Sequence, residues 1–507
     1  MSPVRGAASV GRGLAAAREA RPIREGERIH VVGAGGAGAS AAALLAGYRG
    51  AVVSGCDPGG PSPYTPPLLA AGIHLDWAHD QKHVTRRPAP DRLAVTKALT
   101  AVDPDNPELA AARASSVPLE PWQQVIADAA VGKTLVGVAG THGKSTTSGW
   151  LVHVLVEAGL DPCAFVGALL PPPLAGPLPA TARWGAGAAF VVEADEYAGN
   201  FDPYRPEVAV LTSAEWDHPD VFGDRQAVID CFVAWLKRAG QDVARPILVA
   251  NVGDSGVAEV LERLRDWRGQ IVAARLSDTA TGGWSGSTPA LVGTILQADA
   301  SGTTLRIEGP ALPGGLRARL RLAGRHNAAN ALGVAGAALA LGVSPDSLAA
   351  GLGSFHGVGR RLERKGEGRG VVVYDDYAHH PTAIRETLAA IRQLEPGRRI
   401  WAVYEPLTYH RTAAMLDEFA EVLASADAVA IADIWAGRDA DTHVTSASAL
   451  AEATARRRFG LTSVAPGTVE ETAAWLAGEV RGGDAVLVMG GGRSYRIAEL
   501  LVQALGA

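Results

Sequence analysis

Cysteine is scarce in this sequence. Cys56, Cys163 and Cys231 are its three cysteines among 507 residues, and no two of them form a CxxC pair. Such scattered cysteines indicate neither a disulfide framework nor a cysteine zinc site, and they are typical of a protein from the reducing cytoplasm. No segment has the ~20 uninterrupted apolar residues that a membrane helix requires, so we expect no membrane insertion. Charged residues also interrupt every short apolar stretch of residues 1–28, which excludes a signal-peptide core there.

The chain also lacks an excess of basic residues. Its 47 Lys and Arg against 53 Asp and Glu give a formal net charge of -6. Nucleic-acid binding depends on neutralising phosphates with Lys and Arg, so we expect no nucleic-acid partner. An anionic small molecule would need a local basic site. The 47% apolar and 20% charged composition is ordinary for a folded α/β protein, and the length suggests about three domains.

Short apolar runs alternate with helical stretches along the whole chain, which predicts an α/β protein. We expect an N-terminal extension at 1–28, whose order the sequence leaves open, then domains at 29–132, 133–343 and 344–507. The last boundary rests on Ser344, which is suited to cap a helix that begins at Pro345.

A glycine-rich turn follows the first strand candidate. Its glycines are Gly33, Gly35, Gly36 and Gly38, in a GxGxxG pattern, and Asp57 lies 19 residues past the last of them. Glycine lets the backbone approach a ligand closely, and the next helix offers N–H donors to a pyrophosphate. The pattern fits a dinucleotide site with Asp57 on a ribose, as in NAD-dependent oxidoreductases. It also occurs in turns that are glycine-rich for packing alone.

A second glycine turn is more specific. It reads Gly140-Thr141-His142-Gly143-Lys144-Ser145-Thr146, between a buried-strand pattern and a helical stretch. Gly-Lys-Ser places an ammonium group and a hydroxyl where phosphates and magnesium need them, so we expect Lys144 on the phosphates and Ser145 on the metal. Val138 stands where the full Walker pattern has glycine, which favours a shorter loop. A lysine in the first helical turn opposes the helix dipole unless an anion binds there.

Acidic residues follow the next two strand candidates. Glu193, Asp195 and Glu196 are three acids within four residues, which is electrostatically unfavourable unless a cation compensates. Asp217 and His218 follow the second of these strands. Ligands of α/β units bind at the carboxyl ends of the strands, so we expect a magnesium site here, with a solvated acidic loop as the alternative.

Another polar group follows an apolar strand in the last third of the chain. Residues 374–381 contain Asp376, His379 and His380. Paired His and Asp could coordinate zinc, but no other His or Cys lies nearby at a usual ligand spacing, so substrate or nucleotide contact is favoured. The basic run 360–365 is by default a solvated face, and beside two phosphate-handling features it can instead reach the nucleotide.

In this order the motifs closely resemble those of the Mur ligase family, and most closely its alanine-adding branch, over nearly the whole chain. The residues that carry the resemblance are Gly33 to Gly38, Gly140 to Thr146, Glu193 to Glu196, Asp217-His218, Gly324 to Asn327, Arg360 to Glu363 and Asp375 to Pro381. The resemblance implies a Rossmann-like N-terminal domain, a P-loop-type central ATPase domain and a Rossmann-like C-terminal domain. It also implies that the first glycine turn binds a UDP-sugar, which disfavours the oxidoreductase interpretation.

The resemblance further implies the residues of each site. Lys144, Glu193 and His218 would be catalytic, and Ser145, Glu193 and His218 would surround Mg2+. ATP would contact Gly140, Thr141, His142, Gly143, Lys144, Ser145 and Thr146, with Asn327, and with Arg361 and Asp376 from the C-terminal domain after it closes. The UDP-sugar would lie on Gly33, Gly35, Gly36, Gly38 and Asp57. The amino acid would meet His379, His380 and Arg411.

The implied activity is an ATP-dependent ligation in peptidoglycan precursor synthesis. The carboxylate of UDP-N-acetylmuramate would take the γ-phosphate of ATP, and the amine of L-alanine would then displace phosphate from the acyl phosphate. Some members use a carbamylated lysine near the metal. Val233 stands at that place here, which agrees with the alanine-adding branch.

The acceptor is the part of this interpretation that the sequence supports least. The alanine-adding branch has two arginines in the stretch that here reads Pro406 to Thr412, but Thr408 replaces the first, so that only Arg411 remains. Glu405-Pro406 and Glu196-Tyr197 are similar to the branch that attaches a recycled tripeptide, L-Ala-D-Glu-meso-diaminopimelate. Tripeptide addition is therefore the alternative. We expect a monomer or a homodimer.

Overall fold

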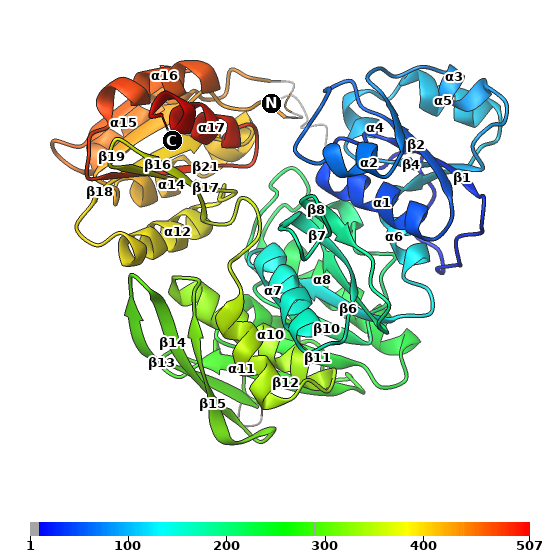
Figure 1. The fold of residues 1–507 in the computed structure, drawn as a ribbon, viewed down its shortest axis with the longest axis horizontal. Helices are drawn as coiled ribbons and strands as arrows, with labels where there is room; N and C mark the ends of the chain where they lie inside the picture. The colour runs from blue at the N-terminus through cyan, green and yellow to red at the C-terminus, as the bar shows by residue number, and fades with distance from the viewer. Residues whose placement is uncertain (1–9, 287–289, 438, 440, 507) are drawn as a thin grey trace.

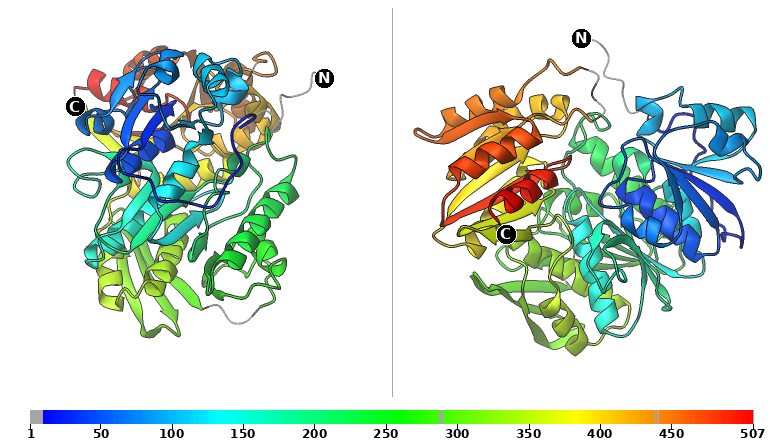
Figure 2. Two further views of the ribbon diagram at one scale, coloured as in Figure 1. Left: turned by 90° about the vertical axis from the view of Figure 1, so that its right-hand side faces the viewer. Right: turned by 45° about the horizontal axis from the view of Figure 1, so that its top comes forward.

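Three α/β domains make up the protein, each on its own sheet (Figure 1). The computed structural model describes residues 10–286, 290–437, 439 and 441–506. The first and C-terminal domains lie next to each other against the central domain, as the right-hand view of Figure 2 also shows. The predicted α/β class with three domains is confirmed. Among the described helices, none is long and apolar enough to cross a membrane.

The first domain is a five-stranded parallel sheet with the strand order β3-β2-β1-β4-β5. Its strands are β1 (Arg28–Val32), β2 (Val52–Cys56), β3 (His74–Asp76), β4 (Arg92–Val95) and β5 (Leu119–Pro121). Its helices are α1 (Ala37–Tyr48), α2 (Pro66–Ala70), α3 (Lys82–Thr85), α4 (Leu99–Val102), α5 (Pro107–Ala114) and α6 (Trp122–Ala129). Parallel strands need crossover connections, and the first glycine turn is the start of one, between β1 and α1.

The segment before β1 is part of the first domain from residue 10 onward. The Ala15 amide donates to Leu119 O at 2.8 Å, and the Arg18 guanidinium donates to Glu120 at 2.8 Å and to Asp128 at 2.7 Å. These bonds hold the segment against β5 and α6. Of the expected extension, residues 1–9 lie outside the described part of the chain.

The central domain is a ten-stranded sheet with the order β15-β14-β13-β12-β11-β10-β6-β9-β7-β8. Its strands are β6 (Thr134–Ala139), β7 (Cys163–Leu170), β8 (Ala180–Arg183), β9 (Ala189–Ala194), β10 (Val208–Leu211), β11 (Ile247–Asn251), β12 (Gln270–Leu276), β13 (Leu291–Asp299), β14 (Gly302–Gly309) and β15 (Leu312–Leu320). Its helices include α7 (Lys144–Glu157), α8 (Arg225–Asp242), α9 (Ser255–Glu262) and α10 (Arg325–Ala340). The antiparallel ribbon β13-β14-β15 was not expected, because its exposed polar residues look like those of loops.

The helix that follows the predicted boundary packs against the central domain. Helix α11 (Pro345–Ser354) begins at the predicted place, with the Ser344 hydroxyl accepting the Ser347 amide at 3.2 Å. However, Leu348 and Leu352 of α11 are buried in the same cluster as Val154 of α7. The helix therefore belongs to the central domain. A capping residue marks the start of a helix and says nothing about which core the helix joins.

The C-terminal domain is a six-stranded sheet with the order β16-β17-β21-β18-β19-β20. Its strands are β16 (Glu363–Gly368), β17 (Val371–Asp376), β18 (Arg399–Glu405), β19 (Ala428–Ala432), β20 (Thr462–Gly467) and β21 (Asp484–Gly490). Its helices are α12 (Pro381–Leu394), α13 (Tyr409–Ala414), α14 (Leu416–Leu423), α15 (Ala447–Arg457), α16 (Val469–Glu479) and α17 (Tyr495–Ala504). Buried residues on both faces of the sheet form two separate clusters.

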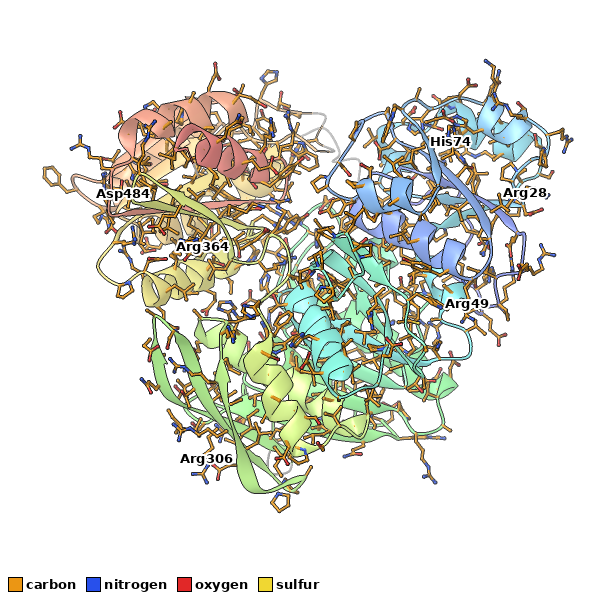
Figure 3. The ribbon with its side chains drawn as sticks, viewed as in Figure 1. Arg28, Arg49, His74, Arg306, Arg364 and Asp484 are labelled. Carbon is orange, nitrogen blue, oxygen red and sulfur yellow. The ribbon has the colours of Figure 1, made fainter. Side chains whose placement is uncertain are left out.

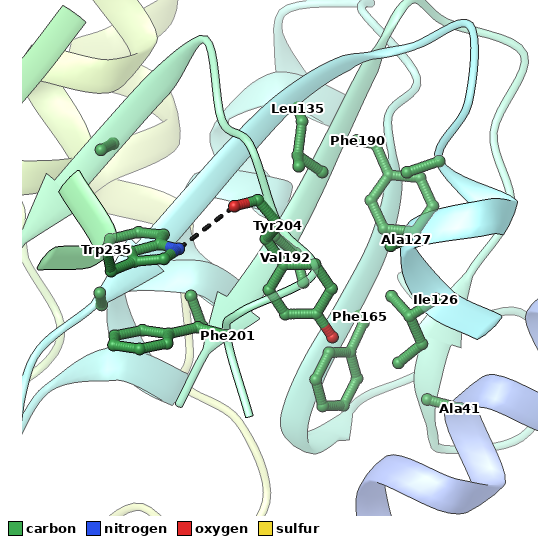
Figure 4. Packing of buried hydrophobic residues seen from close by; sticks show 14 of the residues in the cluster. Ala41, Ile126, Ala127, Leu135, Phe165, Phe190, Val192, Phe201, Tyr204 and Trp235 are labelled. Carbon is green, nitrogen blue, oxygen red and sulfur yellow. Dashed lines mark hydrogen bonds between the residues drawn. The ribbon is translucent and has the colours of Figure 1, made fainter. Parts of the chain in front are cut away.

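The first and central domains share one hydrophobic core. Figure 4 shows Ala41 of α1 and Ile126 of α6 in the same cluster as Phe165, Phe190 and the other central-domain side chains. Burial of apolar surface stabilises by roughly 25 cal/mol per Å² of area removed from water. This contact therefore fixes the first domain firmly on the central one.

A buried ionic network in the first domain generates a test of stability. Arg92, with a side chain 2% exposed, contacts Glu27 at 3.0 Å, Glu120 at 2.7 Å and Asp128 at 2.5 Å. Arg92→Met removes the fully buried cation from this network and leaves the carboxylates only the more exposed Arg18 and Arg21. We therefore expect it to lower the free energy of unfolding by about 3–5 kcal/mol. Urea unfolding measures this loss.

Arg24→Met is the control for this substitution. Arg24 is 71% exposed and lies 3.8 Å from the same Glu27. Its removal should change the free energy of unfolding by less than about 1 kcal/mol. Equal effects of the two substitutions would show that the buried network does not stabilise the domain.

Candidate functional site

All three domains line one cavity of about 1400 Å³. The first domain contributes Gly38, Tyr64 and Trp122 to its wall. The central domain contributes the second glycine turn and the acids after β9 and β10. The C-terminal domain contributes residues 360–365 and 375–380, together with Arg411. Most residues predicted for the sites therefore meet at one place, although they are far apart in the sequence.

The second glycine turn joins β6 to α7 and presents Lys144 at the helix start. Gly143 has φ +81°, and a Cβ atom there would lie 2.5 Å from Asn330 Oδ1, so only glycine fits. Lys144 Nζ donates to Gly140 O at 2.6 Å and to Glu196 Oε2 at 2.8 Å. The lysine thus folds back over its own turn, toward the acids at the end of β9.

Lys144 is a charged lysine whose side chain is only 12% exposed. Burial opposes its charged form, but the carboxylates of Glu196, Asp195 and Glu193 outweigh this effect and raise the pKa of Lys144. Burial also raises the pKa of Glu196, which Lys144 only partly counteracts. The ammonium group therefore stays protonated at neutral pH, as phosphate binding requires.

Ser145 and Glu193 form a hydrogen-bonded pair beside this lysine. Ser145 Oγ donates to Glu193 Oε1 at 2.9 Å, and Glu193 Oε2 accepts the Gly167 amide at 2.6 Å. Arg361 of the C-terminal domain donates to Ser145 Oγ at 2.9 Å. The predicted contact of Arg361 with the nucleotide-binding region thus has a structural basis, because its guanidinium reaches the glycine turn across the domain boundary.

His218, which follows β10, lies close to the acids that follow β9. One ligand atom each from Asp195, Glu196 and His218 lies within 4.8 Å of the others. The ring of His218 also packs edge-on against Tyr197, with centroids 4.8 Å apart. The metal set implied by the resemblance is therefore divided into two groups: Ser145 with Glu193, and His218 with Asp195 and Glu196, two acids of the run for which the sequence also predicted a magnesium site.

Asp217 connects the central domain to the C-terminal one. Arg411 Nη2 donates to Asp217 Oδ1 at 2.5 Å and lies 3.2 Å from His218 Nδ1. Burial raises the pKa of Asp217, but His218 and Arg411 outweigh it and hold that pKa well below its usual range. The Arg411 atom Nη1 is buried and has no hydrogen-bond partner among the residues that the structure describes.

The two predicted histidines of the C-terminal domain lie in the same cavity wall. His380 Nε2 lies 3.2 Å from Trp216 O, and its ring centroid is 4.8 Å from that of His142. Burial, followed by the nearby His142, lowers the pKa of His380 to about 4. Burial likewise lowers the pKa of His379 well below the usual value. Both imidazoles are therefore neutral at pH 7.

Asp376 shapes the turn that carries Arg361. One carboxylate oxygen accepts the Leu362 amide at 2.6 Å, and the other accepts the Ala378 amide at 2.7 Å. In the central domain, Asn327 donates to Ala323 O at 2.7 Å and accepts from Asn330 at 3.2 Å. The structure thus places both predicted nucleotide-binding residues at the cavity, where their side chains also order neighbouring backbone.

Of the residues predicted for the first glycine turn, Gly38 lines the cavity, whereas Gly33, Gly35, Gly36 and Asp57 do not. The Gly35 amide donates to Asp57 Oδ2 at 2.9 Å, so the two predicted features are in direct contact. A Cβ atom on Gly38 would lie 2.2 Å from the ring of Trp122. Gly38 is therefore required for packing against α6, which was the alternative explanation for at least this glycine.

Sequence reasoning missed several residues of the site. Glu196, which pairs with Lys144, was recognised as one of three acids but was not selected, because spacing alone does not show which acid faces the lysine. Arg360 donates to Gly490 O at 2.7 Å and to Ser494 Oγ at 2.8 Å. The glycine run 490–492 after β21 was a usable signal for this contact. Tyr64 and Trp122 also line the cavity, but neither belongs to a sequence motif that could have predicted it.

Profiles of one family match the chain in three successive segments. The description "Mur ligase family, catalytic domain" matches residues 28–134, "Mur ligase middle domain" matches 138–338, and "Mur ligase, glutamate ligase domain" matches 360–492. A UDP-N-acetylmuramate--L-alanine ligase of Mycobacterium sp. (strain JLS) is 36% identical, over 95% of each chain. The enzyme of that name from Gloeobacter violaceus is 35% identical, over 95% of this chain and 97% of its own.

Solved structures of similar proteins agree on the fold. The UDP-N-acetylmuramate-alanine ligase MurC of Thermotoga maritima superposes with a TM-score of 0.74 at 23% identity, covering 94% of this chain and 98% of its own. A murein peptide ligase from Psychrobacter arcticus gives a TM-score of 0.68 at 23% identity, covering 95% and 99%. At this identity the likeness bears on the three-domain fold alone.

The position of Lys144 predicts a loss of nucleotide affinity on substitution. Lys144→Met removes the one charge-assisted donor of the turn, so we expect the Kd for ATP to rise about 10- to 100-fold. Isothermal titration measures it. Lys133→Met is the control, because Lys133 donates to Gly187 O at 2.5 Å and does not line the cavity. Unchanged affinity in the Lys144 variant would exclude the turn as the phosphate site.

Proposed function

The chain belongs to the Mur ligase family, and from this premise we propose that it is an ATP-dependent ligase that joins L-alanine to the carboxylate of UDP-N-acetylmuramate. Relatives with that name are 35% and 36% identical over 95% of the chain. The family excludes the oxidoreductase interpretation of the first glycine turn. The reaction belongs to peptidoglycan precursor synthesis.

The observation that carries this proposal is the shared cavity. Lys144 lies on its central-domain wall, Gly38 on its first-domain wall and Arg411 on its C-terminal wall. A ligase of this kind must bring a nucleotide, a sugar carboxylate and an amine together, and one binding surface per domain meets this need. Gly33, Gly35, Gly36, Gly38 and Asp57 would hold the UDP-sugar, and the turn at 140–146 would hold ATP.

The chemistry proceeds in two balanced steps. A carboxylate oxygen of the sugar forms a bond to the γ-phosphorus while the bond to the β-phosphate oxygen breaks, which yields an acyl phosphate and ADP. The amine then attacks the acyl carbon, the bond to the phosphate oxygen breaks, and the amine loses a proton as inorganic phosphate leaves. Lys144 stabilises negative charge on the transferring group. Arg361, which donates to Ser145 Oγ, would bind the same phosphates.

The donor set fits Mg2+. Magnesium prefers oxygen ligands, and Ser145, Glu193, Asp195 and Glu196 supply them around the turn, with His218 beside them. When bound, the ion would neutralise phosphate charge and orient the γ-phosphoryl group. The side chains named here account for this role without any other cofactor. Asn327 and Asp376 would complete the nucleotide site.

The acceptor would bind beside Arg411. Its buried Nη1 atom has no partner among the described side chains and main chain, so it can donate to the carboxylate of an amino acid. His379 and His380 are neutral and line the same wall, and they would contact the acceptor without repelling its ammonium group. Thr408, which lines the cavity where the alanine-adding branch has an arginine, leaves Arg411 as the main anchor.

The recycled tripeptide is the alternative acceptor, because Thr408 occupies less space than an arginine. A solved ligase from Neisseria meningitides, described as acting on UDP-N-acetylmuramate and L-alanyl-gamma-D-glutamyl-meso-diaminopimelate, is 27% identical over 66% of this chain. The identity with L-alanine ligases is higher and extends over more of the chain, so L-alanine is our first proposal. The oligomeric state, monomer or homodimer, and the cytoplasmic location stay predictions.

An acceptor panel tests the proposal. Phosphate release from ATP is measured with UDP-N-acetylmuramate and with L-alanine, glycine, L-serine or the tripeptide. We expect turnover with L-alanine, and a kcat/KM for glycine lower by about 10- to 200-fold, since one methyl group is worth about 1–3 kcal/mol. Turnover with the tripeptide alone would overturn the L-alanine assignment and leave the ligase class intact.

A further inference from the structure

A second group of metal-ligating side chains lies in the first domain, outside the cavity wall. His30 comes from β1, Cys56 from the end of β2, His83 from α3 and Glu108 from α5. One ligand atom of each lies within 4.8 Å of the other three. Cys56 Sγ is 3.0 Å and His30 Nε2 is 3.6 Å from Glu108 Oε1, which His83 Nδ1 also contacts. These four residues are called the first-domain cluster below.

The His30 imidazole is the independent sign of a ligand. Its side chain is 3% exposed, and Nε2 has no hydrogen-bond partner in the described part of the chain. A buried polar atom that lacks a hydrogen-bond partner makes folding less favourable, because it has given up its hydrogen bonds to water. Because Nε2 points toward Cys56, His83 and Glu108, a cation at their centre would satisfy it.

The outer nitrogens of both histidines are already oriented. His30 Nδ1 lies 2.9 Å from Ser54 Oγ, and His83 Nε2 lies 3.0 Å from Asp76 Oδ2. Histidines that bind a metal through one nitrogen usually donate the other N–H to an oxygen, which fixes the ring and its tautomer. Both rings here present their remaining nitrogen to the centre of the cluster.

We propose that His30, Cys56, His83 and Glu108 bind a zinc ion. One thiolate, one carboxylate and two imidazoles suit Zn2+, which is borderline soft and takes four ligands in a tetrahedron. The two anionic ligands balance its charge. Four protein ligands leave no open position, so the site is structural and not catalytic.

Hydrogen bonding around Glu108 is the competing explanation. His79 Nδ1 lies 2.9 Å from Glu108 Oε2, so this carboxylate has polar neighbours without any metal. In that explanation His30 Nε2 has only Glu108 Oε1 as a neighbour, at 3.6 Å, which is too long for a hydrogen bond. It also keeps Cys56 as a neutral thiol, because burial and then the charge of Glu108 raise the pKa of that group.

Zinc in this position would stabilise the first glycine turn. The Cys56 carbonyl oxygen accepts the amides of Gly33 at 2.9 Å and Ala34 at 3.0 Å. The next residue, Asp57, accepts the Gly35 amide. A metal that fixes the end of β2 against α3 and α5 therefore also fixes the backbone on which the turn rests. Cysteine spacing could not reveal this site, because each ligand comes from a different element.

Metal analysis of the untagged protein tests the proposal. We expect one equivalent of zinc after purification, and loss of that zinc in Cys56→Ser and His83→Gln. The controls are Cys163→Ser, a buried cysteine elsewhere, and His74→Gln, an exposed histidine on neighbouring β3 (Figure 3). Both controls should keep the metal. Zinc that is absent from the wild type even after addition of zinc salt, or that persists in both ligand variants, overturns the assignment.

Asp76→Asn keeps the test decisive if the ligand variants do not fold. Asp76 is 42% exposed and contacts Nε2 of His83, the ring nitrogen that faces away from the cluster. Its substitution should therefore leave the fold intact. We expect the Kd for zinc, measured by competition with a chelator, to rise about 10- to 100-fold. Cobalt in place of zinc should give a thiolate-to-metal absorption band that Cys163→Ser keeps. An unchanged Kd, or a cobalt spectrum without that band, contradicts the proposal.

Discussion

The site depends on one partly buried cation, Lys144, at the N-terminus of α7. A lysine at this end of a helix is unfavourable, and its burial adds a desolvation cost. Glu196 at 2.8 Å and Asp195 at 3.5 Å compensate for both. These acids can do so because β9 and β6 are neighbours in register, with Ala194 opposite Ala139, so both strands end at the same edge of the sheet. Phosphates would take over part of this compensation, which releases acids toward a metal.

The two domain interfaces have different physical character, and this difference suits a ligase. The first domain shares a hydrophobic cluster with the central domain, so separating the two would expose apolar surface. The C-terminal domain instead reaches the cavity through polar contacts, among them Arg361 on Ser145 and Arg411 on Asp217. Polar contacts of this kind exchange readily with water or ligands, and interfaces between domains that move are more polar than permanent ones. The first-domain wall of the cavity is therefore fixed, while the C-terminal wall is the one suited to open.

The sequence predicted the parts of this structure that depend on local signals. Most residues chosen from the strand-to-turn motifs line one cavity, because residues at the carboxyl ends of neighbouring parallel strands must converge. A cap at Ser344 predicts the start of α11 but carries no information on tertiary packing, so it could not show that α11 packs against the central domain. The partner of Lys144 among three acids, and the approach of His30, Cys56, His83 and Glu108, depend on packing between distant segments. No spacing rule covers such contacts.

Thr408 lines the cavity at the position where the alanine-adding branch of the family has an arginine. Thr408 has φ +62°, a conformation that costs a β-branched residue about 1–3 kcal/mol and persists only where its surroundings enforce it. Here the Thr408 amide donates to Trp435 O at 2.9 Å, and its carbonyl oxygen accepts the Thr412 amide at 3.1 Å. The turn is thus fixed at both ends, directly before the helix that carries Arg411. A rigid turn holds Arg411 in place whichever side chain stands at 408. A threonine in place of an arginine therefore changes the space and charge beside Arg411 and leaves Arg411 itself where it is.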